Sequence, residues 1–215
     1  EYDLLPYIWN GFRTMVRYNY EIPADTPDYR SGFARKKAAA LKNALELMEK
    51  GELVLEKTDD IETLTVLMRQ TQEYKDYSSN TQVLVDAVKS LPYDELWRVY
   101  LVKDSAGEYL AGSLLITDRN RCFYLSGGVS RKAREMNEDA SILCLDSIIG
   151  YSMETGRIFD FEGSIIPGVE YYFRMMGGVQ RQCLRAQKIR NPVYFAAAMI
   201  HNYLNREKQN FKIYP

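Results

Sequence analysis

The feature that most constrains the fold is a change of pattern near residue 130. Before it, three apolar segments are separated by short polar turns, and they predict strands over 96–103, 109–117 and 122–129. Strands joined by tight turns form an antiparallel meander. After it, helical and strand patterns alternate, as in parallel strands connected by helices. The chain therefore predicts one mixed sheet of the α/β (α+β) class, an antiparallel meander followed by a parallel βαβ part, with helices on both faces.

The elements around the meander follow from hydrophobic spacing, proline and glycine. Alternating apolar and polar residues predict an N-terminal strand over 11–22, which Pro23 ends. Residues 1–10 show no clear period. The remaining predicted elements are helices over 29–50, 61–68, 81–90, 137–154, 167–176 and 192–207, and strands over 53–56, 157–161 and 179–187. We expect residues 1–22 to be a linker strand and residues 23–215 to be one domain.

Charge and composition exclude several classes of function. The chain has 28 basic and 29 acidic residues, so it lacks the overall positive charge of DNA-binding proteins, and DNA is not an expected partner. The three cysteines are widely spaced and the one histidine is His201, which leaves no pattern for a metal site or a Ser-His-Asp triad. No apolar run is long enough for a membrane span and no signal peptide is found, so we expect a cytoplasmic protein.

A family resemblance rests on motifs that follow one another along the chain. In the second half they are Tyr124-Leu-Ser-Gly-Gly-Val-Ser130, Phe159-Asp-Phe-Glu-Gly-Ser164, Pro167-Gly-Val-Glu-Tyr-Tyr-Phe-Arg174 and Gly177-Gly178. Upstream, the linker strand carries Trp9-Asn-Gly-Phe12 and Arg17-Tyr-Asn-Tyr20. Together these motifs resemble the second GNAT-like domain of FemAB-type proteins, a group of acyl and aminoacyl transferases in the GNAT acyltransferase superfamily. The resemblance covers most of the chain, residues 9–188.

The resemblance implies an N-acyltransferase. An acyl or aminoacyl group would move to an amine by direct attack, without a covalent enzyme intermediate. It implies no permanently bound cofactor, an acyl-CoA or an aminoacyl-tRNA as donor, and a small-molecule or peptide amine as acceptor. The first GNAT-like domain of the two-domain members has no counterpart in this sequence, so we expect the chain to be the C-terminal half of such a protein.

The alternative is a non-catalytic GNAT-like module that binds a peptide, a cell-wall precursor or a partner domain. It is favoured by residues 131–136, which lack the glycines of the usual acyl-CoA loop of GNAT proteins. The two hypotheses differ in whether the chain binds and uses an acyl donor.

Two carboxylates provide the clearest candidates for chemistry. Asp160 and Glu162 are two residues apart on a predicted strand, so their side chains would share one face. Apolar neighbours predict an interior strand, where unpaired charges are costly. One carboxylate would be a general base or would bind the ammonium group of the acceptor, and Tyr124 is the third catalytic candidate. The alternative is a buried ion-pair network with Arg174 or Arg17.

The segment 126–131 is predicted to be the loop between the third meander strand and the next helix. Free N–H groups at such a strand-to-helix connection bind phosphate. Ser126, Gly127, Gly128, Val129 and Arg131 are therefore the cofactor-binding candidates. The alternative is a glycine-permitted bulge followed by a solvated basic turn.

Three further residues are candidates for binding the acceptor. They are Arg17, Tyr20 and Arg174, and Arg174 is expected to pair with one of the two carboxylates. The basic residues Arg35, Lys36 and Lys37 lie on the first long predicted helix, where we expect a solvated helix face.

Overall fold

The computed structural model describes residues 3–74, 81–135, 140–163 and 167–188. The predicted helix over 192–207, His201 and Ser164 lie outside these residues. The elements, in chain order, are α1 (Leu5–Trp9), β1 (Arg13–Ile22), the 3-10 helix η1 (Tyr29–Gly32), α2 (Arg35–Glu49), β2 (Leu53–Thr58), α3 (Ile61–Tyr74), α4 (Thr81–Lys89), β3 (Trp97–Asp104), β4 (Tyr109–Thr117), β5 (Arg121–Val129), α5 (Arg131–Glu135), α6 (Ser141–Glu154), β6 (Ile158–Asp160), α7 (Pro167–Met175) and β7 (Val179–Gln187).

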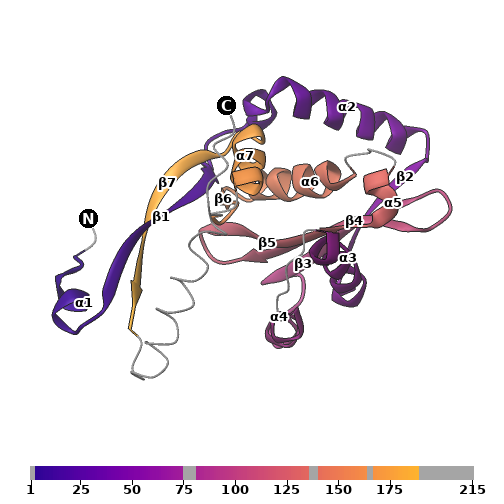
Figure 1. Cartoon of the computed structure of the whole chain (residues 1–215). Helices are drawn as coiled ribbons and strands as arrows, with labels where there is room; N and C mark the ends of the chain where they lie inside the picture. Colours follow the sequence, from indigo (N-terminus) through magenta and orange to yellow (C-terminus); the bar gives the residue numbers. More distant parts are fainter. Residues whose placement is uncertain (1–2, 75–80, 136–139, 164–166, 189–215) are drawn as a thin grey trace. The chain divides into compact units, whose positions relative to one another are not determined.

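The strands form one sheet in the order β2-β3-β4-β5-β6-β1-β7 (Figure 1). Strands β2 to β5 pair antiparallel, as the meander predicted. Strand β6 runs parallel to β5 and antiparallel to β1. The mixed sheet is therefore confirmed, and the N-terminal strand lies inside it, beside β6.

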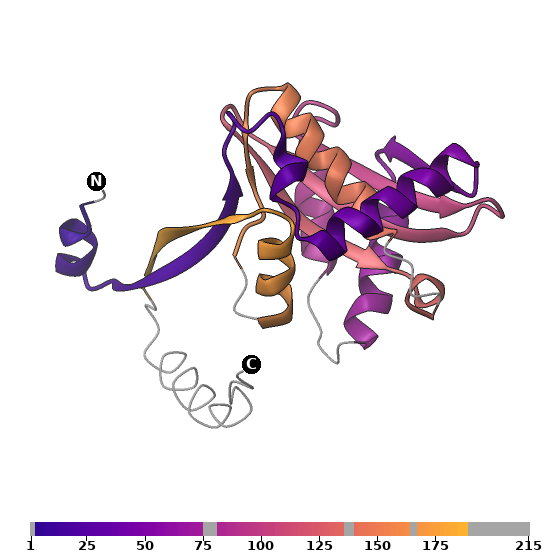
Figure 2. The ribbon, with the colours of Figure 1, turned by 90° about the horizontal axis from the view of Figure 1, so that it is seen from above.

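Helices cover both faces of the sheet, which confirms the prediction. Figure 1 shows α2, α6 and α7 on one face and α3 and α4 on the other. One hydrophobic core, with Leu41 and Ile148, lies on the α2 and α6 side. A second core, with Leu64 and Val99, lies under α3 and α4. The view from above shows α2 beside α6 (Figure 2), and α6 is largely buried.

The segment that precedes α2 is held against α6 by an ion pair between the half-exposed Arg30 and the buried Asp146. Asp146 on α6 accepts hydrogen bonds from both Nε and Nη2 of Arg30, at 2.8 and 2.6 Å. The hydroxyl of Tyr29 donates to the same carboxylate at 3.0 Å. Burial and the charge of Asp146 raise the pKa of Tyr29 to about 12. Because Tyr29 and Arg30 belong to η1, this network fixes the segment that leads into α2.

The segment 126–129 is part of β5, so the predicted loop is wrong. Helix α3 crosses the sheet directly above it, and a Cβ atom on Gly128 would clash with the backbone of Leu67 and Met68. A bulge is present, because Tyr124 and Ser126 pair with consecutive residues of β4 and Leu125 is left between them. Gly128 therefore allows α3 to pack closely on the sheet.

The described chain divides into two compact units, which we describe separately. The described residues within 18–181 form one unit, and residues 3–17 with 182–188 form the other. In the second unit, the short helix α1 was not predicted; Pro6 lies in its first turn, but the helix is too short to show a period. There, Tyr7 packs edge-on against Phe12, and Lys188 Nζ donates to the Asn10 carbonyl at 2.6 Å. In the described part of the chain, no helix has both the length and the apolar character needed to cross a membrane.

Candidate functional site

Strands β5 and β6 pair over only three residues and then diverge. Their last pair is Phe123 with Asp160. Beyond it the chain follows β1, where Phe161 N–H donates to the Tyr20 carbonyl at 2.9 Å. Strand β5 instead continues with β4 to Val129. Within the described ranges, the edge of β5 that faces away from β4 has no strand partner over 124–129. We call this the β5–β6 opening.

Asp160 ends β6 in a buried polar network. Its side chain is buried, with the residue 3% exposed. It accepts hydrogen bonds from the Glu162 N–H at 2.8 Å, from Arg121 at 3.1 Å and from Asn19 at 3.4 Å. Arg121 also pairs with Glu21 at 2.6 Å. Burial raises the pKa of Asp160 even with the arginine beside it. The network holds this carboxylate in place and shields it from solvent.

Glu162 lies outside the strand and is exposed, so the predicted shared face is wrong. Its φ angle of 63° is in the left-handed region, which non-glycine residues rarely adopt. The left-handed backbone of Glu162 turns the chain after Asp160. Side chains beyond this point no longer alternate between the two faces of the sheet. Tyr20 N–H donates to its carbonyl at 3.1 Å, which holds the turn. Partial burial, followed by the charge of Asp160, raises the pKa of the Glu162 carboxyl.

Gly163 explains how this turn fits against β1. A Cβ atom at this position would clash with the carbonyl oxygen of Tyr18, and it would lie 3.0 Å from the Asn19 side chain. Only glycine leaves room for the turn to approach the strand this closely. In the segment Asp-Phe-Glu-Gly, Asp160 thus ends the strand, Glu162 has a strained backbone and Gly163 makes a close backbone contact with β1.

The partners predicted for the carboxylates are different from those observed. Arg174 or Arg17 was expected to pair with a carboxylate of this network. The residue that pairs with Asp160 is instead Arg121, which was predicted to lie in a turn. Arg174 instead pairs with Glu170 on its own helix, so that predicted pairing is wrong. Arg17 is half-buried and belongs to the other compact unit. Arg121 was missed because its partner follows it by 39 residues and no local pattern links them.

Tyr124 and Tyr20 occupy different environments. Tyr124 lies on β5 at the start of the β5–β6 opening, edge-on to Phe173 with ring centroids 6.2 Å apart. Its hydroxyl lies over Gly127, where a Cβ atom would clash with it. Tyr20 is 2% exposed. Its hydroxyl donates to Glu170 and accepts from Gln180, which ties β1 to α7 and β7.

The remaining predicted binding residues are tied to helix α3. Ser126 Oγ contacts the Met68 sulfur at 3.5 Å. Val129 N–H donates to Thr71 Oγ1 at 2.8 Å. Arg131 begins α5, and its N–H donates to Gln70 Oε1 at 3.0 Å. Several groups that the sequence assigned to phosphate binding are thus engaged within the protein.

The sheet order and the β5–β6 opening agree with a match of the sequence to a known family. Residues 32–174 match the acetyltransferase (GNAT) domain family. The chain belongs to this family. The resemblance to the GNAT superfamily that the motifs indicated is thereby confirmed. No curated protein matches this GNAT domain.

Solved structures share the fold of this GNAT domain. FemX superposes with a TM-score of 0.67 at 16% identity, over 84% of this chain and 63% of FemX. The C-terminal domain of a putative lysylphosphatidylglycerol synthetase from Agrobacterium fabrum has a TM-score of 0.56 at 13% identity, over 94% of this chain and 69% of that one. L-PGS from Bacillus licheniformis has a TM-score of 0.55 at 14% identity, over 95% and 70%. The GNAT domain thus spans less than two thirds of FemX.

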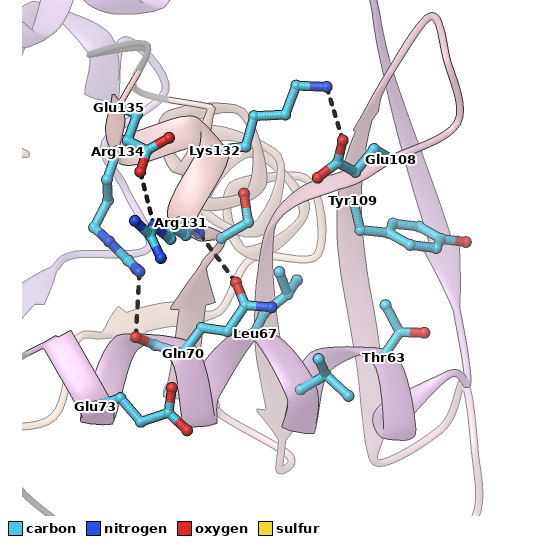
Figure 3. Close-up of a pocket in the computed structure, with 12 residues that line it drawn as sticks. Thr63, Leu67, Gln70, Glu73, Glu108, Tyr109, Arg131, Lys132, Arg134 and Glu135 are labelled. Carbon is cyan, nitrogen blue, oxygen red and sulfur yellow. Dashed lines mark hydrogen bonds and ion pairs between the residues drawn. The ribbon is translucent and has the colours of Figure 1, made fainter.

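Helix α5 separates two pockets of the GNAT domain. The first, of about 950 Å³, lies between α3, the start of β4 and α5 (Figure 3). Its charges pair with one another, since Lys132 bonds to Asp104 and Glu108 and Arg131 bonds to Glu135. The pocket therefore presents little net charge. In the described part of the chain, no group of three His, Cys, Asp or Glu residues could hold a metal ion.

The second pocket, of about 920 Å³, lies between α2, α5 and the start of α6, and we call it the α2 groove. Its basic lining residues are Lys36, Lys37, Lys50 and Arg134. The basic start of α2 was predicted to be a solvated helix face, whereas Lys37 is only 9% exposed. The sequence did contain a signal for this pocket: alanines such as Ala40 and Ala44 lie between Lys36 and Lys50 on the helix face that lines it.

Proposed function

We propose that this GNAT domain transfers an acyl or aminoacyl group from a thioester or ester donor to an amine at the β5–β6 opening. The observation that carries the proposal is Glu162, an exposed carboxylate with a raised pKa on a strained backbone at the end of β6. Strained residues gather at functional sites. A carboxylate whose pKa is raised is a better general base.

The proposed reaction is a direct attack. The amine nitrogen bonds to the carbonyl carbon, and its proton passes to Glu162. The carbonyl oxygen becomes an oxyanion, which backbone N–H groups on the open edge of β5 can stabilise. The bond from carbon to sulfur or oxygen then breaks and the leaving group takes a proton, for which Tyr124 is our candidate donor. Asp160 acts as a positioning residue, since its carboxylate holds the Glu162 N–H.

The donor that a GNAT domain favours is an acyl-CoA. Aminoacyl-tRNA stays an alternative donor, which the match to the GNAT domain family does not support. We propose a small-molecule or peptide amine as the acceptor and no permanently bound cofactor. Since the chain spans 63% of FemX, we also propose that a first GNAT-like domain is its partner, with residues 1–22 as the linker and Arg17 as an acceptor contact.

Release of thiol from acetyl-CoA tests the proposed function directly. We expect release that depends on an added amine, chosen from a panel of small amines and peptides. Mass spectrometry of the protein after incubation with acetyl-CoA alone should show no acetylated protein, since direct attack forms no acyl-enzyme. An acetylated residue that is consumed when amine is added would contradict direct attack, and no release with any amine would contradict transfer.

A non-catalytic binding module is the second candidate. It is favoured by the N–H groups of Val129 and Arg131, which are bonded within the protein rather than free for a carrier. Thermal unfolding with and without acetyl-CoA separates the two, because a ligand that binds only the folded state raises the melting temperature. A concentration-dependent rise would count against the binding module, and no rise would count against the acyl-CoA donor.

A further inference from the structure

We propose that Tyr20 is a positioning residue that couples helix α7 to the proposed base, Glu162. The inference rests on the proposed function, since it assigns a further residue to the same reaction. Tyr20 was predicted to contact the acceptor amine, but the residue is only 2% exposed and can act only through its neighbours. Its backbone and its side chain bond to the two ends of one segment, residues 162–170.

The backbone of Tyr20 holds the first end of this segment. Its N–H donates to the Glu162 carbonyl at 3.1 Å, and its carbonyl accepts from the Phe161 N–H at 2.9 Å. These bonds continue the contact between β1 and the chain past Asp160, where β6 ends. The bond to the Glu162 carbonyl holds this residue at its φ angle of 63°, a conformation that non-glycine residues rarely adopt. The position of the Tyr20 backbone therefore sets the position of Glu162.

The side chain of Tyr20 holds the other end of the segment. Its hydroxyl donates to Glu170, in the first turn of α7, and accepts from Nε2 of Gln180 on β7 at 2.9 Å. The single O–H donor of the phenol is thus committed to α7. Burial, followed by the bond to Glu170, raises the pKa of Tyr20, so the hydroxyl stays protonated and keeps donating at neutral pH.

Packing leaves Tyr20 little freedom to move independently of α7. Its ring centroid lies 6.4 Å from that of Phe173 on α7, and Phe173 lies 5.1 Å from Phe161, the residue before Glu162. A Cβ atom on Gly178 would lie only 3.0 Å from the Tyr20 Cβ atom. A displacement of α7 is therefore transmitted through Tyr20 to the turn that carries Glu162. A shift of about 1 Å in a reacting group is enough to slow a reaction by about 10²-fold.

The variant Y20F tests the inference, because it keeps the ring and the backbone bonds and removes only the hydroxyl. We expect kcat of acyl transfer to fall by about 10- to 100-fold with KM nearly unchanged, since the buried Tyr20 does not touch substrate. E170A should reproduce the loss, and E170Q should recover most of the rate, because a glutamine oxygen still accepts from the hydroxyl. The matched control is Y29F, which removes a hydroxyl bond to Asp146 instead and should keep the wild-type rate.

Two further measurements separate positioning of Glu162 from a general loss of packing. If Tyr20 acts through Glu162, the hydroxyl matters only while the base is present, so Y20F/E162Q should transfer at the same rate as E162Q. A looser Glu162 is also better solvated, which brings its raised pKa back toward the ordinary value. The acid limb of kcat/KM should therefore move to lower pH in Y20F.

Two kinetic results would overturn the inference. They are a wild-type kcat in Y20F, and a loss on adding Y20F to E162Q that is as large as in the wild type. Amide hydrogen exchange, measured by NMR without turnover, should become faster at positions 20 and 161 in Y20F. Unchanged exchange beside an impaired E162Q counts only against Tyr20, whereas a normal rate in E162Q counts against the proposed base itself.

Discussion

Asp160 and Glu162 are separated by a single residue, yet their carboxylates occupy opposite environments. Asp160, inside the sheet, is buried and bonded to Arg121, Asn19 and the Glu162 N–H. Glu162, just outside it, is exposed and strained, and its pKa is raised in part by Asp160. A carboxylate whose oxygens are already used by the protein is suited to positioning. One that is open to solvent, just after the point where β6 diverges from β5, is suited to proton transfer.

Among variants that separate the roles of Asp160 and Glu162, we expect the largest effect in E162Q, which should lose acyl transfer. Removing a general base lowers the rate by about 10²–10⁴-fold. The single-turnover rate of acyl transfer measures it, and CoA binding should stay unchanged. The control is E154Q, an exposed glutamate at the end of α6, which should keep the wild-type rate. An E162Q protein that turns over normally would remove Glu162 from the mechanism.

Replacing Gly163 by alanine should disturb the turn that carries Glu162. The new Cβ atom would clash with the Tyr18 carbonyl, and such overpacking costs about 1–3 kcal/mol. We expect lower stability in urea unfolding together with slower transfer. The matched control is G168A on α7, where a Cβ atom meets nothing within 4 Å. If G163A were as stable and as active as G168A, the close contact would not hold Glu162.

D160N should have the smallest effect on the rate, a loss of less than about tenfold, because it leaves the base in place. Its effect on stability has a definite sign. Burial raises the pKa of Asp160 in the folded protein, so the wild type loses stability as the pH rises above the ordinary pKa of an aspartate. D160N should not lose stability in this way, because an asparagine side chain does not titrate. Unfolding free energies should therefore shift in favour of D160N between acidic and neutral pH. A shift that favours the wild type would mean that the ion pair with Arg121 outweighs burial.

The sequence predicted those parts of the fold that depend on local patterns. Turns and apolar alternation gave the meander, and proline and glycine marked the ends of α7. Pairing between distant segments was beyond such patterns: β1 joins β6 through Glu21 and Asp160, which are far apart in the chain. The same holds for Arg121 as the partner of Asp160.

The candidate site was predicted by residue type but not by geometry. Asp160 and Glu162 were singled out because charges on an apolar strand need an explanation. The positive φ of Glu162 could not be predicted from the sequence. A strand pattern implies that side chains alternate up to the last residue of the predicted strand. The close contact of Gly128 with α3 could not be predicted from the sequence, because glycine permits a phosphate loop and a close helix contact equally well.

The pH dependence of kcat/KM in wild type and E162Q tests the central claim most directly. Both the acceptor amine and Glu162 must be deprotonated, so log kcat/KM of the wild type should fall toward acid and steepen below the raised pKa of Glu162. In E162Q, the residual activity should fall with the amine alone and show no steepening. An inflection that stays at the same pH in E162Q would contradict the assignment of Glu162 as the base.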